Sequence, residues 1–247
     1  MESKNKNLIL APSNKESLVT EWVANNEIRN FDVWLTYYDD DYYDEGFKKI
    51  VPTLGPGDND KVFVEKGFKY PKAYEIISTS KTVFDYEYVW MPDDDILLDT
   101  ESINKFFSIM KEYDLWLAMP SIDRSSHRTF GNQLHQAGNI LRYVGFVEVQ
   151  CPAFSNYALK KCYQTFNESQ SGWGIDLVWP ALLGRPLNKI AIVDGVIAKH
   201  TRPVGAGDLY KRLNVDPDAE MHAMKNKYGV KMDGNIYGYV KKENGNS

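Results

Sequence analysis

Short apolar runs alternate with amphipathic stretches along most of the chain, a pattern that predicts a mostly parallel sheet flanked by helices. The strands expected from these runs are Leu8–Ala11, Asp32–Tyr38, Tyr86–Met91, Leu115–Met119, Ile140–Val149 and Ile190–Val193. Helical spacing is clearest in Glu101–Tyr113, where Ile103, Phe106, Phe107 and Met110 fall on one face. Further helices are expected over Glu16–Asn25, Pro71–Ser80 and Tyr157–Phe166. The fold class predicted is therefore α/β.

The pattern changes in the C-terminal part of the chain. One helix is expected there, because Pro217 stands at its start and Gly229 at its end, as helix termini favour. We interpret residues 1–205 as a single α/β domain and residues 206–240 as a helical extension that packs on it. Residues 241–247 are expected to form a disordered tail.

Composition narrows the function classes. Apolar residues make up 43% of the 247 positions, enough for a sizeable core, and the net charge of −5 gives no electrostatic support for nucleic acid as a partner. No stretch approaches the ~20 apolar residues of a membrane-spanning helix. We expect a cytoplasmic protein, with a peripheral position at the inner membrane as the alternative. Cys151 and Cys162 are expected to be reduced, buried thiols.

Three consecutive aspartates, Asp93, Asp94 and Asp95, directly follow the predicted strand Tyr86–Met91 and Pro92. Carboxylates this close repel one another at neutral pH unless a cation neutralises them. The end of a central strand is also where open α/β sheets bind ligands. We interpret the run as a site at which Mn²⁺ or Mg²⁺ holds a diphosphate. A solvated acidic turn is the alternative.

A second candidate is the turn from Gly172 to Asp176. Glycines at Gly172 and Gly174 allow the backbone to pass close to a ligand, and Trp173 offers a flat face on which a sugar ring can stack. Asp176 falls in the first turn of a helix, where the dipole favours an ionised carboxylate that can act as a general base. An ordinary aspartate that caps its helix is the alternative.

The third candidate is His200, which follows a predicted strand and stands between Lys199 and Arg202. Imidazole can complete a metal shell that carboxylates begin, although an isolated histidine is more often structural. Arg202 is a cation suited to phosphate. Lys69 belongs to a basic and aromatic patch that, alone, resembles solvated surface. The P-loop, the Rossmann fingerprint and the nucleophile elbow are all absent from the sequence.

Taken in order, these features resemble the GT-A glycosyltransferase superfamily. In that superfamily an Asp-x-Asp motif after a strand binds the metal and diphosphate of a nucleotide-sugar, a later turn supplies an acid on the acceptor side, and a still later histidine can complete the metal shell. Asp93 to Asp95, the turn Trp173 to Asp176, and His200 match that order.

A narrower resemblance runs from about Asn7 to Gly205. It is to an uncharacterised plant and bacterial family, some of whose plant members are labelled lysine-ketoglutarate reductase trans-splicing-related. The segments that carry it include Leu35–Asp39, Lys66–Tyr70, Tyr86–Trp90, Pro120–Asp123, Gly145–Glu148 and Pro152–Ser155. The plant members read Asp-Glu-Asp where this chain has three aspartates, so Asp94 is the least certain ligand.

The resemblance implies transfer of a sugar from a UDP- or GDP-sugar to a hydroxyl on a glycan or lipid-linked glycan, in capsule, lipopolysaccharide or other surface-glycan synthesis. Asp93, Asp95 and His200 would bind the metal, and Asp176 would deprotonate the acceptor, which implies inversion. Trp173 and Gly174 would contact the acceptor sugar. The residues expected around the donor are Pro12, Ser13, Tyr38, Asp39, Lys69, Asp93, Asp94 and Arg202.

Two other function classes remain open on the sequence. A sugar-phosphate nucleotidyltransferase would need a loop rich in Gly and Arg or Lys after the first strand, and Pro12 to Lys15 is poor for that purpose. A non-catalytic glycan- or protein-binding module would not need the aspartate run, Asp176 or His200. These features favour the transferase.

Overall fold

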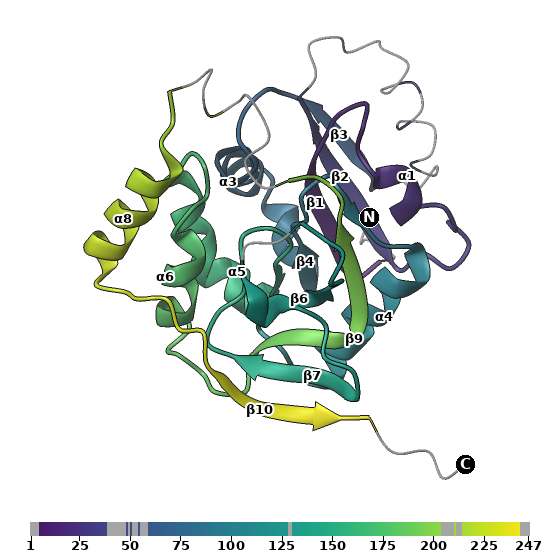
Figure 1. Ribbon diagram of the computed structural model, residues 1–247. Helices are drawn as coiled ribbons and strands as arrows, with labels where there is room; N and C mark the ends of the chain where they lie inside the picture. Colours follow the sequence, from purple (N-terminus) through teal and green to yellow (C-terminus); the bar gives the residue numbers. More distant parts are fainter. Residues whose placement is uncertain are drawn as a thin grey trace, which may run out of the picture.

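A mixed sheet forms the centre of the computed structural model (Figure 1), which describes residues 5–38, 48, 50, 54, 59–127, 130–203, 210 and 214–242. The strands are β1 (Asn7–Ser13), β2 (Phe31–Tyr37), β3 (Lys61–Val64), β4 (Tyr88–Trp90), β5 (Ile96–Leu97), β6 (Leu117–Ile122), β7 (Asn139–Val144), β8 (Ala153–Ser155), β9 (Ile190–His200) and β10 (Ile236–Lys241). The helices are α1 (Val19–Trp22), α3 (Lys69–Thr79), α4 (Thr100–Glu112), α5 (Asn156–Cys162), α6 (Ile175–Leu182) and α8 (Pro217–Tyr228), with 3-10 turns η1 (Lys81–Asp85), η2 (Gly131–Gln133) and η3 (Tyr163–Asn167).

The strand order is β10-β7-β9-β6-β8-β4-β1-β2-β3, with β5 paired to β9 off this path. The pairings of β3, β2, β1 and β4 are parallel, and so is that of β6 with β9. Only β8 and β7 run against the common direction among these nine strands. The expected α/β domain with a sheet of mostly parallel strands is therefore confirmed.

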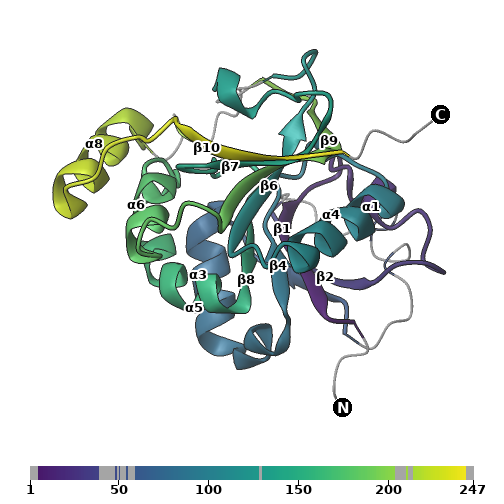
Figure 2. The ribbon, with the colours of Figure 1, turned by 90° about the horizontal axis from the view of Figure 1, so that it is seen from below.

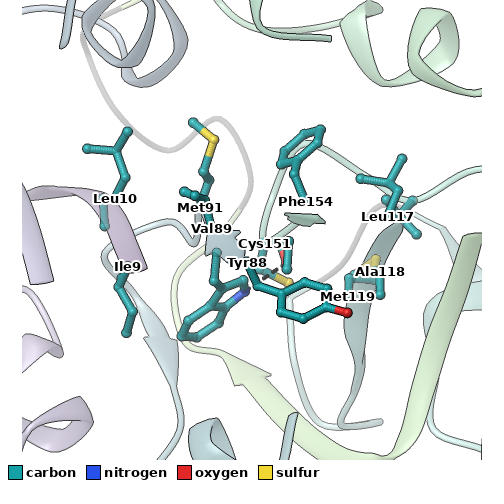
Figure 3. Packing of buried hydrophobic residues seen from close by; sticks show 14 of the residues in the cluster. Ile9, Leu10, Tyr88, Val89, Met91, Leu117, Ala118, Met119, Cys151 and Phe154 are labelled. Atoms are coloured by element: carbon teal, nitrogen blue, oxygen red, sulfur yellow. Dashed lines mark hydrogen bonds between the residues drawn. The ribbon is translucent and has the colours of Figure 1, made fainter. Parts of the chain in front are cut away.

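Helices cover both faces of the sheet. Figure 2 shows α3, α5 and α6 on one face and α1 and α4 on the other. Successive side chains of a strand point to opposite faces of the sheet, so the strands supply apolar residues to both helix–sheet interfaces. Leu10 and Phe154 point to one face, and Ile9 and Tyr88 to the other (Figure 3). The tryptophans Trp22, Trp34, Trp90 and Trp179 are fully buried and belong to the core.

Several helix boundaries follow the expected capping chemistry. Asp99 accepts a hydrogen bond from the Ser102 N–H and begins α4, and Asp216 does the same for α8, whose first residue is Pro217. The helix expected over Glu16–Asn25 is shorter: only Val19–Trp22 is helical. Ser17 N–H instead donates to the Asn14 carbonyl and forms a turn before the helix.

The strand expected over Ile140–Val149 also ends early, at Val144. A Cβ on Gly145 would lie 2.4 Å from the Asp233 side chain and main chain, so the chain turns there against the C-terminal segment. Residues 145–152 then leave the sheet and cross to the carboxyl ends of the parallel strands. We call residues 145–152 the crossing segment.

The C-terminal extension is more than helical. Beyond α8, strand β10 pairs antiparallel with β7 and adds an edge to the sheet, a strand that was not predicted although Ile236–Lys241 is rich in residues that favour strands. Lys241 ends this strand, so the tail predicted for 241–247 is not disordered at its first residue, and 243–247 lie outside the described residues. Cys151 and Cys162 are buried free thiols, as expected. Within the described part of the chain, none of the helices is long and apolar enough to cross a membrane.

Candidate active site

The site lies at the edge of the sheet where the parallel strands β1, β2 and β4 end. The chain leaves β4 through Pro92 and the three aspartates and enters the short strand β5, which pairs with the end of β9. In that pairing Ile96 lies opposite His200, so His200 comes next to Asp95 although 105 positions separate the two in sequence. Ligand atoms of Asp93, Asp95 and His200 all lie within 4.8 Å of one another.

The orientation of His200 is set from both ring nitrogens. Nδ1 lies 2.6 Å from the main-chain carbonyl oxygen of His127, and an oxygen that only accepts requires a proton on Nδ1. Nε2 therefore faces Asp95 Oδ2, 3.1 Å away. Burial lowers the pKa of His200, but the hydrogen bond and charge of Asp95 outweigh it and raise the pKa above its ordinary value. Without a cation, a protonated Nε2 donates to Asp95; with one, neutral Nε2 is a ligand.

Asp94 is directed away from that cluster. Its carboxylate accepts from the Tyr38 hydroxyl at 2.9 Å and from the Arg202 guanidinium. Burial raises the pKa of Asp94 to about 6, and Arg202 and Tyr38 offset this only in part. The hydroxyl of Tyr38 in turn accepts from the Asn14 amide at 2.7 Å. Tyr38, Asp94 and Arg202 thus form one hydrogen-bonded group beside the three candidate ligands.

Arg202 also reaches Asp95. Its main-chain N–H donates to Asp95 Oδ2 at 3.2 Å, and its Nε lies 3.4 Å from the same oxygen. Burial alone would raise the pKa of Asp95, but His200 and Arg202 together lower it. Arg202 keeps 36% of its side chain exposed, so its cation remains accessible at the rim of the site.

Lys69 neutralises the remaining aspartate. Its Nζ lies 2.8 Å from Asp93 Oδ1 and also donates to the carbonyls of Val149 and Gln150, at 2.8 and 3.0 Å. The burial of Asp93 raises its pKa, against the opposing charge of Lys69. Lys69 is therefore fixed at the start of α3 by the crossing segment, with its charge on the aspartate run.

The other residues expected around a donor lie in different surroundings. Pro12 lines a small crevice at the ends of β1 and β2 together with Thr36 and Lys69. Ser13 is buried and its hydroxyl is 2.9 Å from that of Ser17, so its side chain faces the protein. Asp39 lies outside the described residues.

Asp176 is in the first turn of α6 and 6% exposed. Its Oδ2 accepts from the Val149 N–H at 3.4 Å and its Oδ1 from the Leu177 N–H at 3.0 Å. Burial, with a contribution from the neighbouring Glu148, raises the pKa of Asp176 to about 7. Val149 is also the residue whose carbonyl binds Lys69, so a single peptide segment ties Asp176 to the aspartate run.

The glycines of the preceding turn serve packing inside the protein. Gly172 and Gly174 have φ of +81° and +88°, which favour glycine. A Cβ on Gly172 would lie 2.6 Å from the Tyr70 ring, and one on Gly174 would lie 2.9 Å from the Cα of Met221 in α8. The close neighbours of both glycines are thus protein atoms, whereas the sequence suggested a ligand. Trp173, between them, is partly exposed.

Sequence reasoning missed three contributors to the site. The crossing segment at Val149 and Gln150 has no motif. Glu220 of α8 accepts from the Gln170 and Ser171 N–H groups at 3.0 and 2.8 Å and so holds the turn before Trp173. Tyr210 stacks on Phe68 with ring centroids 5.7 Å apart. Each acts across a long sequence separation that leaves no local signal.

Comparison with known proteins places the chain in a family. A family model described as "Protein of unknown function (DUF707)" matches residues 2–234, so the chain belongs to this family. No curated protein sequence matches the chain. The family description carries no reductase or splicing activity, and the label expected from plant relatives stays a prediction.

Solved structures of nucleotide-sugar enzymes share the fold. Glucosyl-3-phosphoglycerate synthase from Mycobacterium tuberculosis, in complex with Mn²⁺, UDP-glucose and phosphoglyceric acid, matches with a TM-score of 0.55 at 11% identity, over 93% of this chain and 82% of that one. S. aureus TarS 1–349 in complex with UDP-GlcNAc matches with a TM-score of 0.55 at 13% identity, over 90% and 72%. At these identities the likeness establishes the fold, which confirms the GT-A-like architecture expected from the sequence.

Proposed function

We propose that this protein is a metal-dependent glycosyltransferase that moves a sugar from a nucleotide-diphosphate sugar to a hydroxyl acceptor. The observation that carries the proposal is the convergence of Asp93, Asp95 and His200 at the carboxyl end of the parallel strands. The shared fold adds support, because the structures in that fold include complexes with UDP-sugars and with Mn²⁺.

The donor set fits a divalent cation of the Mn²⁺ or Mg²⁺ type. Two carboxylates and one imidazole are ligands such ions accept, and Nε2 of His200 is left for coordination because Nδ1 is held by a carbonyl. When bound, the cation would offset the negative charge that builds on the leaving diphosphate. Asp93 and Asp95 would hold it, and the remaining positions would be open to the donor.

The surrounding cations and hydroxyls suit the rest of the donor. Arg202 and Lys69 each contact one of the aspartates, and they can turn to phosphate oxygens once a divalent ion neutralises the carboxylates. Tyr38 and Pro12 line the ends of β2 and β1, where nucleoside binding is expected for this kind of sheet. We propose the same for Asp39. Ser13 would contribute its main chain, since its hydroxyl faces Ser17.

Asp176 is proposed as the general base that takes the proton of the acceptor hydroxyl. A pKa of about 7 is close to the optimum for a base that works near neutral pH. A base on the acceptor side, separate from the leaving diphosphate, implies inversion at the anomeric carbon. Trp173 would stack on the acceptor sugar, and Gly174 would shape its turn.

The acceptor we propose is a glycan or lipid-linked glycan in surface polysaccharide synthesis, reached in the cytoplasm or at the inner membrane. A panel of nucleotide-sugars, followed by thermal shift with Mn²⁺ and then with EDTA, tests the function. The melting temperature should rise for a UDP- or GDP-sugar, and only with Mn²⁺. An equal rise in EDTA would remove the metal role, and no rise with any donor would remove the function. NMR of the product then gives the anomeric outcome.

A further inference from the structure

Within the crossing segment, the main chain of residues 149–152 contacts Asp176, Lys69 and the start of the aspartate run. The Val149 N–H donates to Asp176, and its carbonyl accepts from Lys69 and from the Tyr70 hydroxyl. The Gln150 carbonyl accepts from the Asp93 N–H at 2.8 Å, and the Pro152 carbonyl from Met91. One short segment therefore fixes the positions of the base, the aspartate run and the lysine.

Gln150 adds a side-chain contact to these. Its amide lies 2.9 Å from Nδ1 of His200, through the atom placed as Nε2. The same Nδ1 is 2.6 Å from the His127 carbonyl. Two lone pairs at that distance would repel each other, so Nδ1 carries the proton, and a second N–H cannot face it. The amide atom nearest Nδ1 must then be Oε1 and not Nε2. The amide of Gln150 is therefore turned by 180° about the bond that carries it.

Rotation also exchanges the surroundings of the two amide atoms. As placed, Oε1 of Gln150 is buried without a hydrogen-bond partner among the described residues. After rotation the oxygen accepts from Nδ1–H, which it shares with the His127 carbonyl. Rotation moves the amide nitrogen to that buried position, so each of the two orientations leaves one amide atom without a hydrogen-bond partner among the described residues. The rotated one is favoured because it replaces a contact between two N–H groups at Nδ1 with a hydrogen bond.

From this geometry we infer that Gln150 is a positioning residue that fixes the tautomer and direction of His200, so that Nε2 faces Asp93 and Asp95. The inference rests on the proposed function in that it assigns Nε2 to a metal ion. Groups that accept the distal N–H of a metal-binding histidine fix its ring and increase the basicity of the ligand nitrogen. The His127 carbonyl belongs to the backbone and cannot be removed by substitution, whereas the Gln150 amide can.

The chain offers a matched control. Gln133 is 1% exposed, and its amide oxygen and nitrogen both lack hydrogen-bond partners within the described part of the chain. It lies in η2 and has no contact with His200 among those described. Gln133→Leu therefore removes a buried amide of the same size without altering the imidazole.

The experiment titrates Mn²⁺ alone into the full chain and its variants by calorimetry. Gln150→Leu should weaken Mn²⁺ binding by about 10- to 100-fold, and Gln150→Glu should restore it, because a carboxylate accepts from Nδ1–H at least as well. Gln133→Leu should bind as the parent chain does. Wild-type affinity in Gln150→Leu, or equal weakening in Gln133→Leu, would overturn the inference. If Gln150→Leu does not fold, Gln150→Ala takes its place.

Proton–nitrogen NMR of the His200 ring separates this inference from the proposed function. If the parent chain does not bind Mn²⁺, the metal role fails, but the ring still reports on Gln150. The Nδ1 signal should show a bound proton in the parent chain, shift in Gln150→Leu and stay unchanged in Gln133→Leu. A protonated Nε2 with a bare Nδ1, or a Nδ1 signal indifferent to Gln150, would refute the positioning role.

Discussion

Two buried aspartates of this protein, Asp194 and Asp176, are held in opposite ways. Asp194 is 1% exposed and accepts from Nε and Nη2 of the fully buried Arg142, at 2.7 and 3.1 Å, and from the Gln136 N–H at 2.9 Å. Asp176 is 6% exposed, and within the described chain its donors are two main-chain N–H groups. Its charged neighbour is another acid, Glu148.

The difference separates an acid that is neutralised by an arginine from the acid that we propose as the base. Arg142 also donates to the carbonyls of Asn132 and Leu134. All the guanidinium nitrogens are therefore hydrogen-bonded, and the Arg142–Asp194 pair holds the loop after β6 against the sheet. Among the described residues no cation pairs with Asp176, and its pKa of about 7 lets it exchange a proton near neutral pH. A buried acid without a matching cation, at the carboxyl end of the sheet, is the stronger functional candidate.

Substitution of Asp176 should have the largest effect, and it should fall on rate. Asp176→Asn retains size and most hydrogen bonds but cannot take the acceptor proton, so transfer should fall by about 10² to 10⁴-fold. Steady-state kinetics with the cognate donor measures the loss. Donor affinity should stay nearly constant. Gly174 is the N-cap of α6 and no side chain caps the helix, so full activity in this variant would mean that Asp176 is a buried structural acid and not the base.

Removal of Arg142, the cation that pairs with Asp194, should lower folding stability instead of the transfer rate. Arg142→Met leaves Asp194 buried and uncompensated, which should lower the free energy of unfolding by about 3–5 kcal/mol, as measured by urea titration. Arg202→Met is the matched comparison, and it should cost no more than about 1 kcal/mol because Arg202 is 36% exposed. A larger loss for Arg202 than for Arg142 would reverse the distinction drawn between the two regions.

The sequence predicted the parts of the site that depend on local pattern. The aspartates follow a strand, and Asp176 opens a helix, and both positions are readable from neighbours in the chain. The partnership of His200 with Asp95 was predicted only through a resemblance, because it depends on the pairing of β5 with β9. A two-residue strand such as β5 carries too little pattern to be recognised.

The contacts that hold the site together were not predictable. Gln150 reaches His200 across 50 positions, and Glu220 reaches Ser171 across 49. Both are single polar residues without a motif, and only the folded chain brings them to their partners. The end of β7 at Val144 was missed for the same reason, since the steric limit at Gly145 comes from Asp233.

Substitutions in the aspartate run should have smaller effects, and the size of the effect should depend on which aspartate is changed. Asp95→Asn should weaken Mn²⁺-dependent UDP binding by at least about tenfold, as expected for loss of a ligand, and should do so more than Asp94→Asn. The reason is that Asp95 contacts His200, whereas Asp94 is engaged by Tyr38 and Arg202. Calorimetry with Mn²⁺ and UDP compares the two. A greater loss for Asp94 would show that the ligands are assigned wrongly.

The smallest expected effect is the pH dependence of transfer, which directly tests the raised pKa of Asp176. With a pKa of about 7, the ionised base increases about tenfold from pH 6 to pH 8 and then levels off. The kcat/KM of the parent chain should follow this curve. Asp176→Asn should lose the rise between pH 6 and pH 8, since the residual reaction does not need that base. A flat profile in the parent chain would contradict the assignment.

The pH dependence of folding stability provides a control. The raised pKa of Asp176 determines whether stability rises or falls with pH. Burial raises the pKa of Asp176 above the unfolded value of 3.8, so between these two values the folded chain binds more protons than the unfolded chain. The stability from Asp176 is then fully present below about pH 4 and is lost as pH rises through about 7. Asp176→Asn, which resembles the protonated acid, should remove this decline from urea midpoints measured across that range. An unchanged decline in the variant would assign it to other groups and leave the raised pKa without support.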